Sequence, residues 1–207
     1  MTHVTTARDT ADRGAGRARA TRAALLAAAR EAFAAGGFAD ANITDVVSRA
    51  GASVGSLYHH FGGKADLYLA LFEDFQLRQE QRAADAVRDA RASGLQDSMQ
   101  LWLVGAKAYL LGCWEERDLA RVFLDGGGPP GFELIARRRY REWVRVNAVL
   151  LNTDDEPLGE TLVVVLTSVV AEAGREVSVQ ENEETAVRLA AEFVELLGRI
   201  GKPADPL

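Results

Sequence analysis

Polar, aromatic and basic side chains gather in one short stretch of this 207-residue chain. A hydroxyl, a phenol, two adjacent imidazoles and an ammonium group follow one another there, as Ser56, Tyr58, His59, His60 and Lys64. Such groups bind phosphate and sugar oxygens through hydrogen bonds and charge. The two histidines point about 100° apart on a helix, and no nearby cysteine or carboxylate completes a metal site. The stretch therefore indicates contacts with nucleic acid, and we expect no metal.

Two short helices joined by a glycine turn would position this stretch. Asn42 can cap the first helix, and Gly51 supplies a turn that tolerates positive φ. Ser53 caps the second helix, in which Leu57 and Phe61 are four residues apart and should both face the core. One buried face of the first helix is predicted by the i, i+3, i+4, i+7 spacing of Ile43, Val46, Val47 and Ala50.

This order of helix, glycine turn and short polar helix predicts a helix-turn-helix unit. In such a unit the second helix presents its N-terminal residues to base edges in the major groove of DNA. Gly55 and Ser56 are small enough there to let the backbone approach the bases. Val54 either touches a thymine methyl group or is half buried, and the sequence favours neither alternative. Lys64 lies in the first turn of the next helix, where free N–H groups favour an anion.

A longer set of residues around this unit follows a family pattern. The set comprises Phe33, Gly36-Gly37-Phe38, Thr44-Asp45-Val46-Val47, Ala50-Gly51-Ala52-Ser53, Gly55-Ser56-Leu57-Tyr58-His59-His60-Phe61, Lys64 and Leu67. With these residues, the segment 21–72 resembles the DNA-binding domain of the tetracycline-repressor (TetR/AcrR) family of transcriptional regulators. The resemblance implies DNA contacts by Thr44, Val54, Gly55, Ser56, Tyr58, His59, His60 and Lys64. Asn42 stands where this family often has threonine, which is a conservative capping change.

The resemblance also implies a function. We expect a homodimeric repressor that binds a near-palindromic operator in double-stranded DNA and is released by a small-molecule effector of unknown identity. The alternative is an all-α interaction or adaptor protein that keeps the motif only for packing. The chain contains no Gly-x-Ser-x-Gly, HExxH or dinucleotide-binding pattern, so we expect no catalytic residues, no enzymatic activity and no cofactor.

Charge is distributed unevenly along the chain, whose net charge is −6. Residues 1–64 contain eight basic and five acidic side chains, so that 8 − 5 = +3. A basic N-terminal end is expected if only that end meets phosphate. We expect residues 1–20 to form a disordered basic arm. Arg17 and Arg19 in this arm either reach the DNA backbone or minor groove or belong to a solvated tail.

Composition favours a cytoplasmic protein. Residues 1–20 lack the apolar core of a secretory signal, and the most apolar run, residues 162–171, is too short to span a bilayer. We therefore expect no membrane association. The single cysteine, Cys113, excludes an intrachain disulfide framework, and its apolar surroundings in the sequence predict an inert buried thiol.

Strand-type alternation is nowhere sustained, so the sequence predicts an all-α fold. An N-terminal three-helix domain over residues 21–66 would be followed by a helical ligand-binding and dimerisation domain over residues 67–207. Besides the helices of the motif, we expect helices over residues 21–35, 64–91, 96–115, 117–125, 130–151, 156–179 and 183–200.

The C-terminal domain offers two candidate sites, each with an ordinary core as the alternative. An apolar ligand cavity with a few polar anchors would be lined by Trp102, Tyr109, Trp114, Phe123, Trp143, Asn147, Ser168 and Glu172. The last two helices carry broad apolar faces, which suggest half of an intermolecular four-helix bundle. The expected dimer residues are Leu158, Leu162, Val165, Leu166, Val169, Phe193, Val194 and Leu197.

Overall fold

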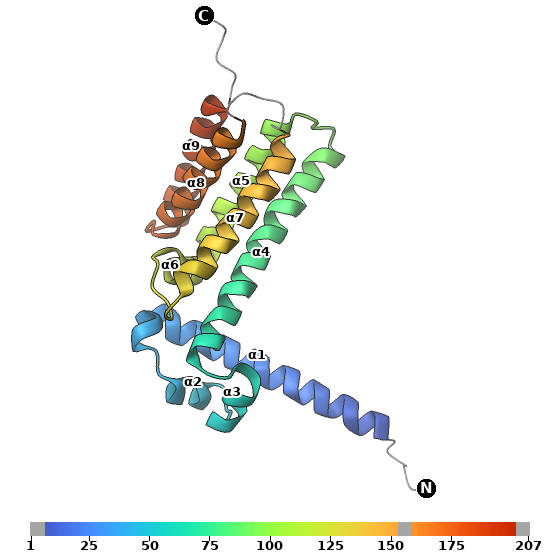
Figure 1. The fold of residues 1–207 in the computed structure, drawn as a ribbon, viewed down its shortest axis with the longest axis vertical. Coiled ribbons are helices and arrows are strands. Elements are labelled where there is room, and N and C mark those ends of the chain that lie inside the picture. Colours follow the sequence, from blue (N-terminus) through green and yellow to red (C-terminus); the bar gives the residue numbers. More distant parts are fainter. Residues whose placement is uncertain (1–6, 153–158, 202–207) are drawn as a thin grey trace, which may run out of the picture. The chain divides into compact units, whose positions relative to one another are not determined.

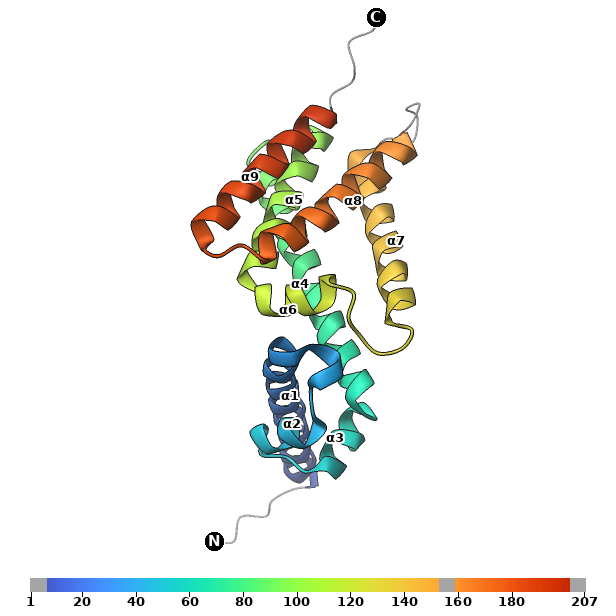
Figure 2. The ribbon, with the colours of Figure 1, turned by 90° about the vertical axis from the view of Figure 1, so that its left-hand side faces the viewer.

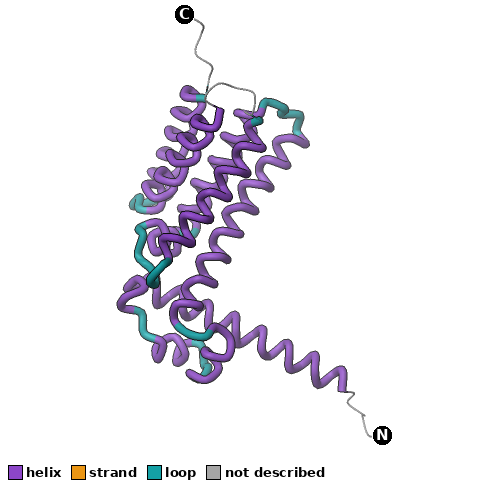
Figure 3. The backbone as a smooth tube through the Cα atoms, in the orientation of Figure 1, coloured by secondary structure: helices purple, strands orange, loops and turns teal. Residues whose placement is uncertain are grey.

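The computed structural model describes residues 7–152 and 159–201, and these residues form helices and loops without strands (Figures 1 and 3). The prediction of an all-α fold is confirmed. The helices are α1 (Ala7–Asp40), α2 (Ile43–Arg49), α3 (Val54–Phe61), α4 (Lys64–Ala92), α5 (Ser98–Glu115), α6 (Arg117–Leu124), α7 (Phe132–Leu151), α8 (Gly159–Ser178) and α9 (Glu183–Ile200). Within the described ranges, none of them is long and apolar enough to cross a membrane.

Side-chain caps explain where several helices begin. Asp97 accepts a hydrogen bond from the backbone N–H of Gln100 at 2.7 Å and starts α5. Asn182 accepts one from the backbone N–H of Thr185 at 3.0 Å and starts α9. These acceptors satisfy N–H groups that have no partner inside the helix. Because such signals are local, the expected bounds of the later helices agree with the structure to within one turn.

α1 begins earlier than expected. The structure is helical from Ala7, which corrects the expectation of a disordered arm for residues 7–20; residues 1–6 lie outside the described residues. Alanine and arginine are strong helix formers, and they fill much of this segment. Near its other end α1 is interrupted at Gly37, whose φ of 66° and ψ of −171° are non-helical. This interruption falls two residues after residue 35, where the sequence predicted the helix to end.

The chain divides into two compact units, Met1–Glu73 with Gly127–Pro129, and Asp74–Gly126 with Pro130–Leu207. α4 contributes its first turns to the first unit and the rest to the second. Tyr68 of α4 is completely buried against Phe33 and Phe38, with ring centroids 5.2 and 5.3 Å apart. This aromatic cluster explains why the first unit extends past residue 66, where we expected the domain boundary.

α5 lies at the centre of the second unit, and α7, α8 and α9 pack against it (Figure 2). Trp102 of α5, Leu166 of α8 and Leu197 of α9 belong to one buried apolar cluster. The approach of α8 to α5 is close at Gly174, where a Cβ atom would lie 2.8 Å from the Tyr109 ring and 3.1 Å from the Cys113 sulfur. The buried thiol expected at Cys113 is confirmed, and burial raises its pKa to about 12.

An ion-pair cluster fixes α4 to the junction of α5 and α6. Glu116 lies at this junction with its side chain 8 % exposed, and it binds Arg78 at 2.7 Å and also Arg82. Arg82 pairs with Glu115 as well, at 3.0 Å. Burial raises the pKa of the Glu116 carboxyl, but the hydrogen bonds and charges of Arg78 and Arg82 outweigh burial and leave the pKa below its ordinary value. The ionised carboxylate therefore stabilises the folded state.

Replacing Glu116 by Gln should lower the free energy of unfolding by about 2 kcal/mol near neutral pH, because charge-assisted hydrogen bonds are lost. The folded-state pKa is lowered, so this stabilisation is complete above the unfolded pKa of about 4.3. It disappears as the pH falls through the folded value. Urea unfolding of both proteins between about pH 7 and about pH 3 measures the difference.

The matched control is Glu115→Gln, because that carboxylate is 60 % exposed in its pair with Arg82. Its effect should stay below about 1 kcal/mol. A Glu116→Gln effect that is equally large at every pH would contradict the ionic explanation.

Candidate nucleic-acid interface

Both helices of the predicted motif start at the expected caps. The side chain of Asn42 accepts a hydrogen bond from the backbone N–H of Thr44 at 2.8 Å, at the start of α2. The Ser53 hydroxyl accepts one from the backbone N–H of Ser56 at 3.1 Å, at the start of α3. Local capping chemistry therefore sets the first residue of each helix, as the sequence predicted.

Backbone hydrogen bonds close the turn between α2 and α3. The N–H of Gly51 donates to the carbonyl oxygen of Ser48 at 3.2 Å, and the N–H of Ala52 donates to that of Val47 at 2.9 Å. Gly51 has a φ of 60°, in the left-handed region where a Cβ atom is strained. The glycine at this position is therefore required by the turn, and the helix-turn-helix geometry is confirmed.

Apolar contacts set the rotation of α2 and α3 about their axes. The residues that anchor the two helices are all at most 6 % exposed, and they are Val46, Val47, Leu57 and Phe61. Ile43 and Ala50, which were expected on the same buried face, are half-buried at its edge. Because Leu57 and Phe61 point inward from one side of α3, the other side of α3 must face away from the core.

The side of α3 that faces away from the core carries most of the predicted DNA contacts. Tyr58 is 53 % exposed on this side. Val54, in the first turn of α3, is 45 % exposed, so its side chain is available to a partner. Ser56 and His60 are half-buried. The candidate interface consists of these four residues together with the exposed Thr44, Gly55 and His59.

His59 and His60 contact each other, with ring centroids 5.2 Å apart and ring planes at 66°. No group of three or more histidine, cysteine or acidic side chains is placed to hold a metal ion within the described ranges. Imidazole nitrogens both donate and accept hydrogen bonds, so this pair suits phosphate or base edges.

Lys64 has an intramolecular role that the sequence did not indicate. Its Nζ donates a hydrogen bond to the carbonyl oxygen of Ala39 at 3.0 Å and lies 4.7 Å from the centre of the Phe38 ring. These contacts join the start of α4 to the last residues of α1, beyond the interruption at Gly37. An ammonium group has further N–H donors, so its contact with phosphate stays a prediction.

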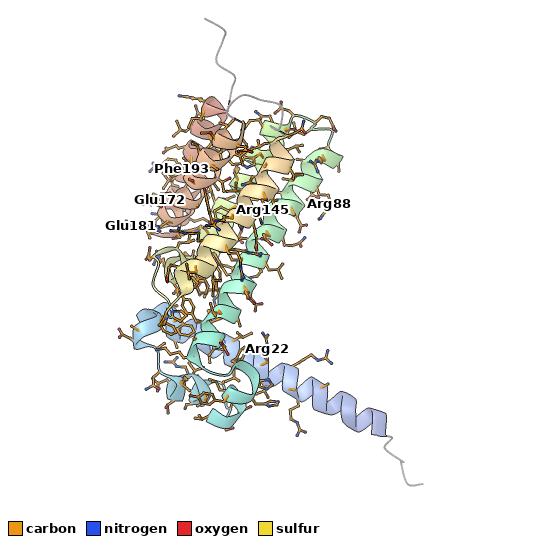
Figure 4. The ribbon with its side chains drawn as sticks, viewed as in Figure 1. Arg22, Arg88, Arg145, Glu172, Glu181 and Phe193 are labelled. Carbon is orange, nitrogen blue, oxygen red and sulfur yellow. The ribbon has the colours of Figure 1, made fainter. Side chains whose placement is uncertain are left out.

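Arg22 is a residue of this region that the sequence prediction missed. Its guanidinium carbon lies 5.0 Å from the centre of the Phe61 ring, in a cation–π contact between α1 and α3. Figure 4 labels Arg22 on α1. Arg22 precedes the buried Leu25 and Leu26 by three and four residues. Continuing the helical period backward from those leucines would have placed Arg22 at the edge of the core.

The predicted ligand residues occupy different environments in the second unit. The aromatic residues are mostly buried, and Tyr109 contacts Trp143 with ring centroids 5.7 Å apart. Asn147 donates a hydrogen bond to the Thr167 hydroxyl at 2.9 Å. Trp102, Trp114 and Phe123 are buried, whereas Ser168 and Glu172 are exposed on α8.

The polar anchors among these residues already have partners inside the protein. Ser168 donates a hydrogen bond to the Val164 carbonyl oxygen at 2.8 Å and contacts the Tyr140 hydroxyl at 2.7 Å. Glu172 is 3.8 Å from Arg175. A surface hollow at the start of α9, lined by residues 182–184, 187 and 188, includes none of the eight predicted ligand residues.

Two of the predicted dimer residues need correction. Leu166 and Leu197 are completely buried in the core of their own unit, because α8 and α9 turn these side chains toward α5. They cannot form an outer contact surface. Val165 is 43 % exposed, and Leu158 lies outside the described residues. The remaining predicted residues are half-buried, namely Leu162, Val169, Phe193 and Val194.

Residues 25–71 match the sequence model of a family described as bacterial regulatory proteins, tetR family. A TetR-family transcriptional regulator from Pectobacterium atrosepticum is 25 % identical, with 91 % of this chain and 98 % of that chain aligned and a TM-score of 0.64. A tetR-family regulatory protein from Rhodococcus RHA1 is also 25 % identical, over 89 % and 98 % of the two chains, with a TM-score of 0.61.

A third similar structure is a gamma-butyrolactone receptor described as ArpA-like. It is 19 % identical over 87 % of this chain and 99 % of that chain, with a TM-score of 0.53, and shows a shared fold. No curated protein sequence gave a match.

Proposed function

We propose, from the premise that the N-terminal domain of this chain belongs to the tetR family of bacterial regulatory proteins, that the protein represses transcription by binding operator DNA. The observation that carries the proposal is the outward side of α3. Tyr58 and His59 are exposed there, while Leu57 and Phe61 hold the helix from the other side; Val54 is exposed in the first turn of α3. In an adaptor that keeps the motif only for packing, these exposed side chains of α3 would have no function.

Each part of the candidate interface has a distinct proposed contact. Gly55 and Ser56, in the first turn of α3, approach base edges in the major groove. Tyr58, His59 and His60 bind phosphate and sugar oxygens, which positions α3 without reading sequence. Thr44 lies in the first turn of α2, where a phosphate would meet backbone N–H groups. The protein would act in the cytoplasm, without catalysis.

Selection of duplexes from a random DNA pool by the full chain, followed by sequencing, tests this proposal. A common near-palindromic site is expected. Tyr58→Ala should weaken binding to every selected duplex by about fivefold, since a lost hydrogen bond costs about 1 kcal/mol. Ser56→Ala should instead change the preferred bases. Val149→Ala, at an 83 % exposed position of α7, is the control and should leave binding unchanged.

A pool that shows no enriched duplex at low salt would contradict the proposal. The adaptor alternative predicts this result.

A homodimer is the second part of the proposal. α8 and α9 pack against each other and leave apolar side chains uncovered. Val165 of α8 is 43 % exposed, and Leu196 and Ile200 of α9 are 48 % and 42 % exposed. The half-buried Leu162, Val169 and Phe193 add to this apolar surface. Packing it against a second copy would form a four-helix bundle, and a two-fold axis matches a near-palindromic operator.

The double variant Val165→Glu/Leu196→Glu should be monomeric in sedimentation equilibrium, because two buried charges without partners in the bundle would oppose association. Its affinity for the selected duplex should fall at least about tenfold, since one copy contacts only half of a two-fold site. Val149→Glu places one charge on α7 and should leave the dimer intact. A double variant that sediments as a dimer would exclude this surface as the interface.

Release by a small molecule is the third part. The gamma-butyrolactone receptor of similar fold is described as a receptor, which supports a ligand site among helices of the second unit. The contact between Tyr109 and Trp143 offers an aromatic wall, and the Asn147 amide offers a polar anchor. α4 belongs to both units, so a ligand that alters its anchoring at Glu116 would act on DNA binding.

Apolar compounds that raise the melting temperature of the protein should weaken its binding to the selected duplex. A coupling free energy of about 1–3 kcal/mol corresponds to a decrease of about 5–150-fold. Thermal shift identifies the compounds, and gel-shift titration measures the decrease. If every stabilising compound leaves the DNA affinity unchanged, effector release is wrong for this protein.

A further inference from the structure

The segment of α1 between Asp12 and Glu31 carries positive charge and no acidic side chain. Residues 14–30 contain four arginines and neither aspartate nor glutamate, in a chain whose net charge is −6. Some exposed arginines on later helices have an acidic partner one turn away. Arg88 lies 2.7 Å from Asp85, and Arg188 lies 3.8 Å from Glu192. Arg17, Arg19 and Arg22 have no acidic side chain three or four residues away in the sequence.

Three of these arginines are exposed: Arg17, Arg19 and Arg22. Among the residues whose side chains the structure describes, no carboxylate pairs with them within 4.0 Å, and Arg22 contacts the Phe61 ring. Arg19 makes one long hydrogen bond, from Nε to the carbonyl oxygen of Ala15 at 3.4 Å. Most of the N–H donors of these guanidinium groups are therefore open to an external anion.

The side of α1 that carries Arg22 is continuous with the candidate interface. Arg22 covers the Phe61 ring, and that ring lies 6.3 Å from the ring of His60. Arg19 precedes Arg22 by three residues, so it lies on nearly the same side of the helix, about one turn further from α3. Arg17 lies about 160° around the helix from Arg19. Arg19 and Arg22 thus extend the surface that begins at His60.

The extended part of α1 receives little support from the rest of its own unit. Residues 14–20 are all exposed, and Figure 1 shows this end of α1 running beyond α2 and α3. Gly14 and Gly16 have no neighbouring atoms within 4 Å of an added Cβ, and each glycine weakens a helix by about 1 kcal/mol relative to alanine. An anion bound along this segment would offset its positive charge.

We propose that Arg19 and Arg22 form a basic stripe on α1 that binds phosphate groups of double-stranded DNA beside the bases contacted by α3. This proposal rests on the proposed function and extends it to a second helix. Guanidinium groups bind phosphate through paired N–H donors, and phosphate contacts add affinity without sequence preference. The ligand is DNA because the stripe continues the surface proposed to meet DNA. Contact with the DNA backbone that flanks the bases bound by α3 would stabilise α1 and lengthen the bound site.

Two single variants that remove the same charge from the same helix test the stripe. Arg19→Ala and Arg17→Ala both introduce the best helix former, and they differ in the side of α1 that loses its arginine. The probe is a duplex selected by the wild-type chain, with about ten flanking base pairs on each side. Its affinity is measured from about 50 to about 200 mM salt. Arg88→Ala, on α4 in the other unit, controls for the general loss of one charge.

Arg19→Ala should reduce the slope of log affinity against log salt by about 0.9 per lost phosphate contact in each subunit. It should also remove the affinity gained from the flanking base pairs. Arg17→Ala and Arg88→Ala should change the slope by less than half as much, and base preference should be unchanged in all three variants. Equal losses for Arg17→Ala and Arg19→Ala, or no loss for Arg19→Ala, would overturn the stripe while leaving α3 binding intact. Failure of the wild-type chain to enrich any duplex would overturn the proposed function itself.

Discussion

Burial of Leu57 and Phe61 decides what α3 can do. α3 spans only residues 54–61, and a helix this short is not stable alone. Its position therefore depends on these two side chains and on the Ser53 cap. With both apolar side chains held inward, Tyr58 and His59 are left on the exposed side. A rotation of α3 by one residue would bury polar groups and expose Phe61. The packing of the core therefore also determines which side chains of α3 are exposed at the interface.

The sequence predicted those parts of the structure that depend on local chemistry. Caps at Asn42 and Ser53 and the turn at Gly51 involve residues within a few positions of one another, so spacing alone identifies them. Contacts between distant residues gave no such signal. The hydrogen bond from Lys64 to the Ala39 carbonyl depends on how α1 ends after Gly37, which periodicity does not describe.

The apolar faces of α8 and α9 in the second unit show the same limit of prediction from sequence spacing. Helical spacing identified Leu166 and Leu197 as apolar positions, and both are buried. The spacing could not say whether α5 or a second copy of the chain covers them, because each partner would select the same residue types. The structure separates the two sets, since Leu196 lies next to Leu197 in sequence and remains 48 % exposed. Only exposure in the folded unit distinguishes an outer apolar surface from core.

α4 is held in each of the two units by contacts of a different kind. In the first unit, Tyr68 is buried among aromatic rings and donates a hydrogen bond to the Gly127 carbonyl oxygen. In the second unit, Arg78 and Arg82 bind Glu116, whose carboxylate is nearly excluded from solvent. Apolar packing tolerates small displacements, whereas charged hydrogen bonds in a buried site lose strength quickly when their geometry changes. A change at the α5–α6 junction would therefore alter the anchoring of α4 before it disturbed the aromatic cluster around Tyr68, and this difference makes the Glu116 contacts the more sensitive of the two anchors.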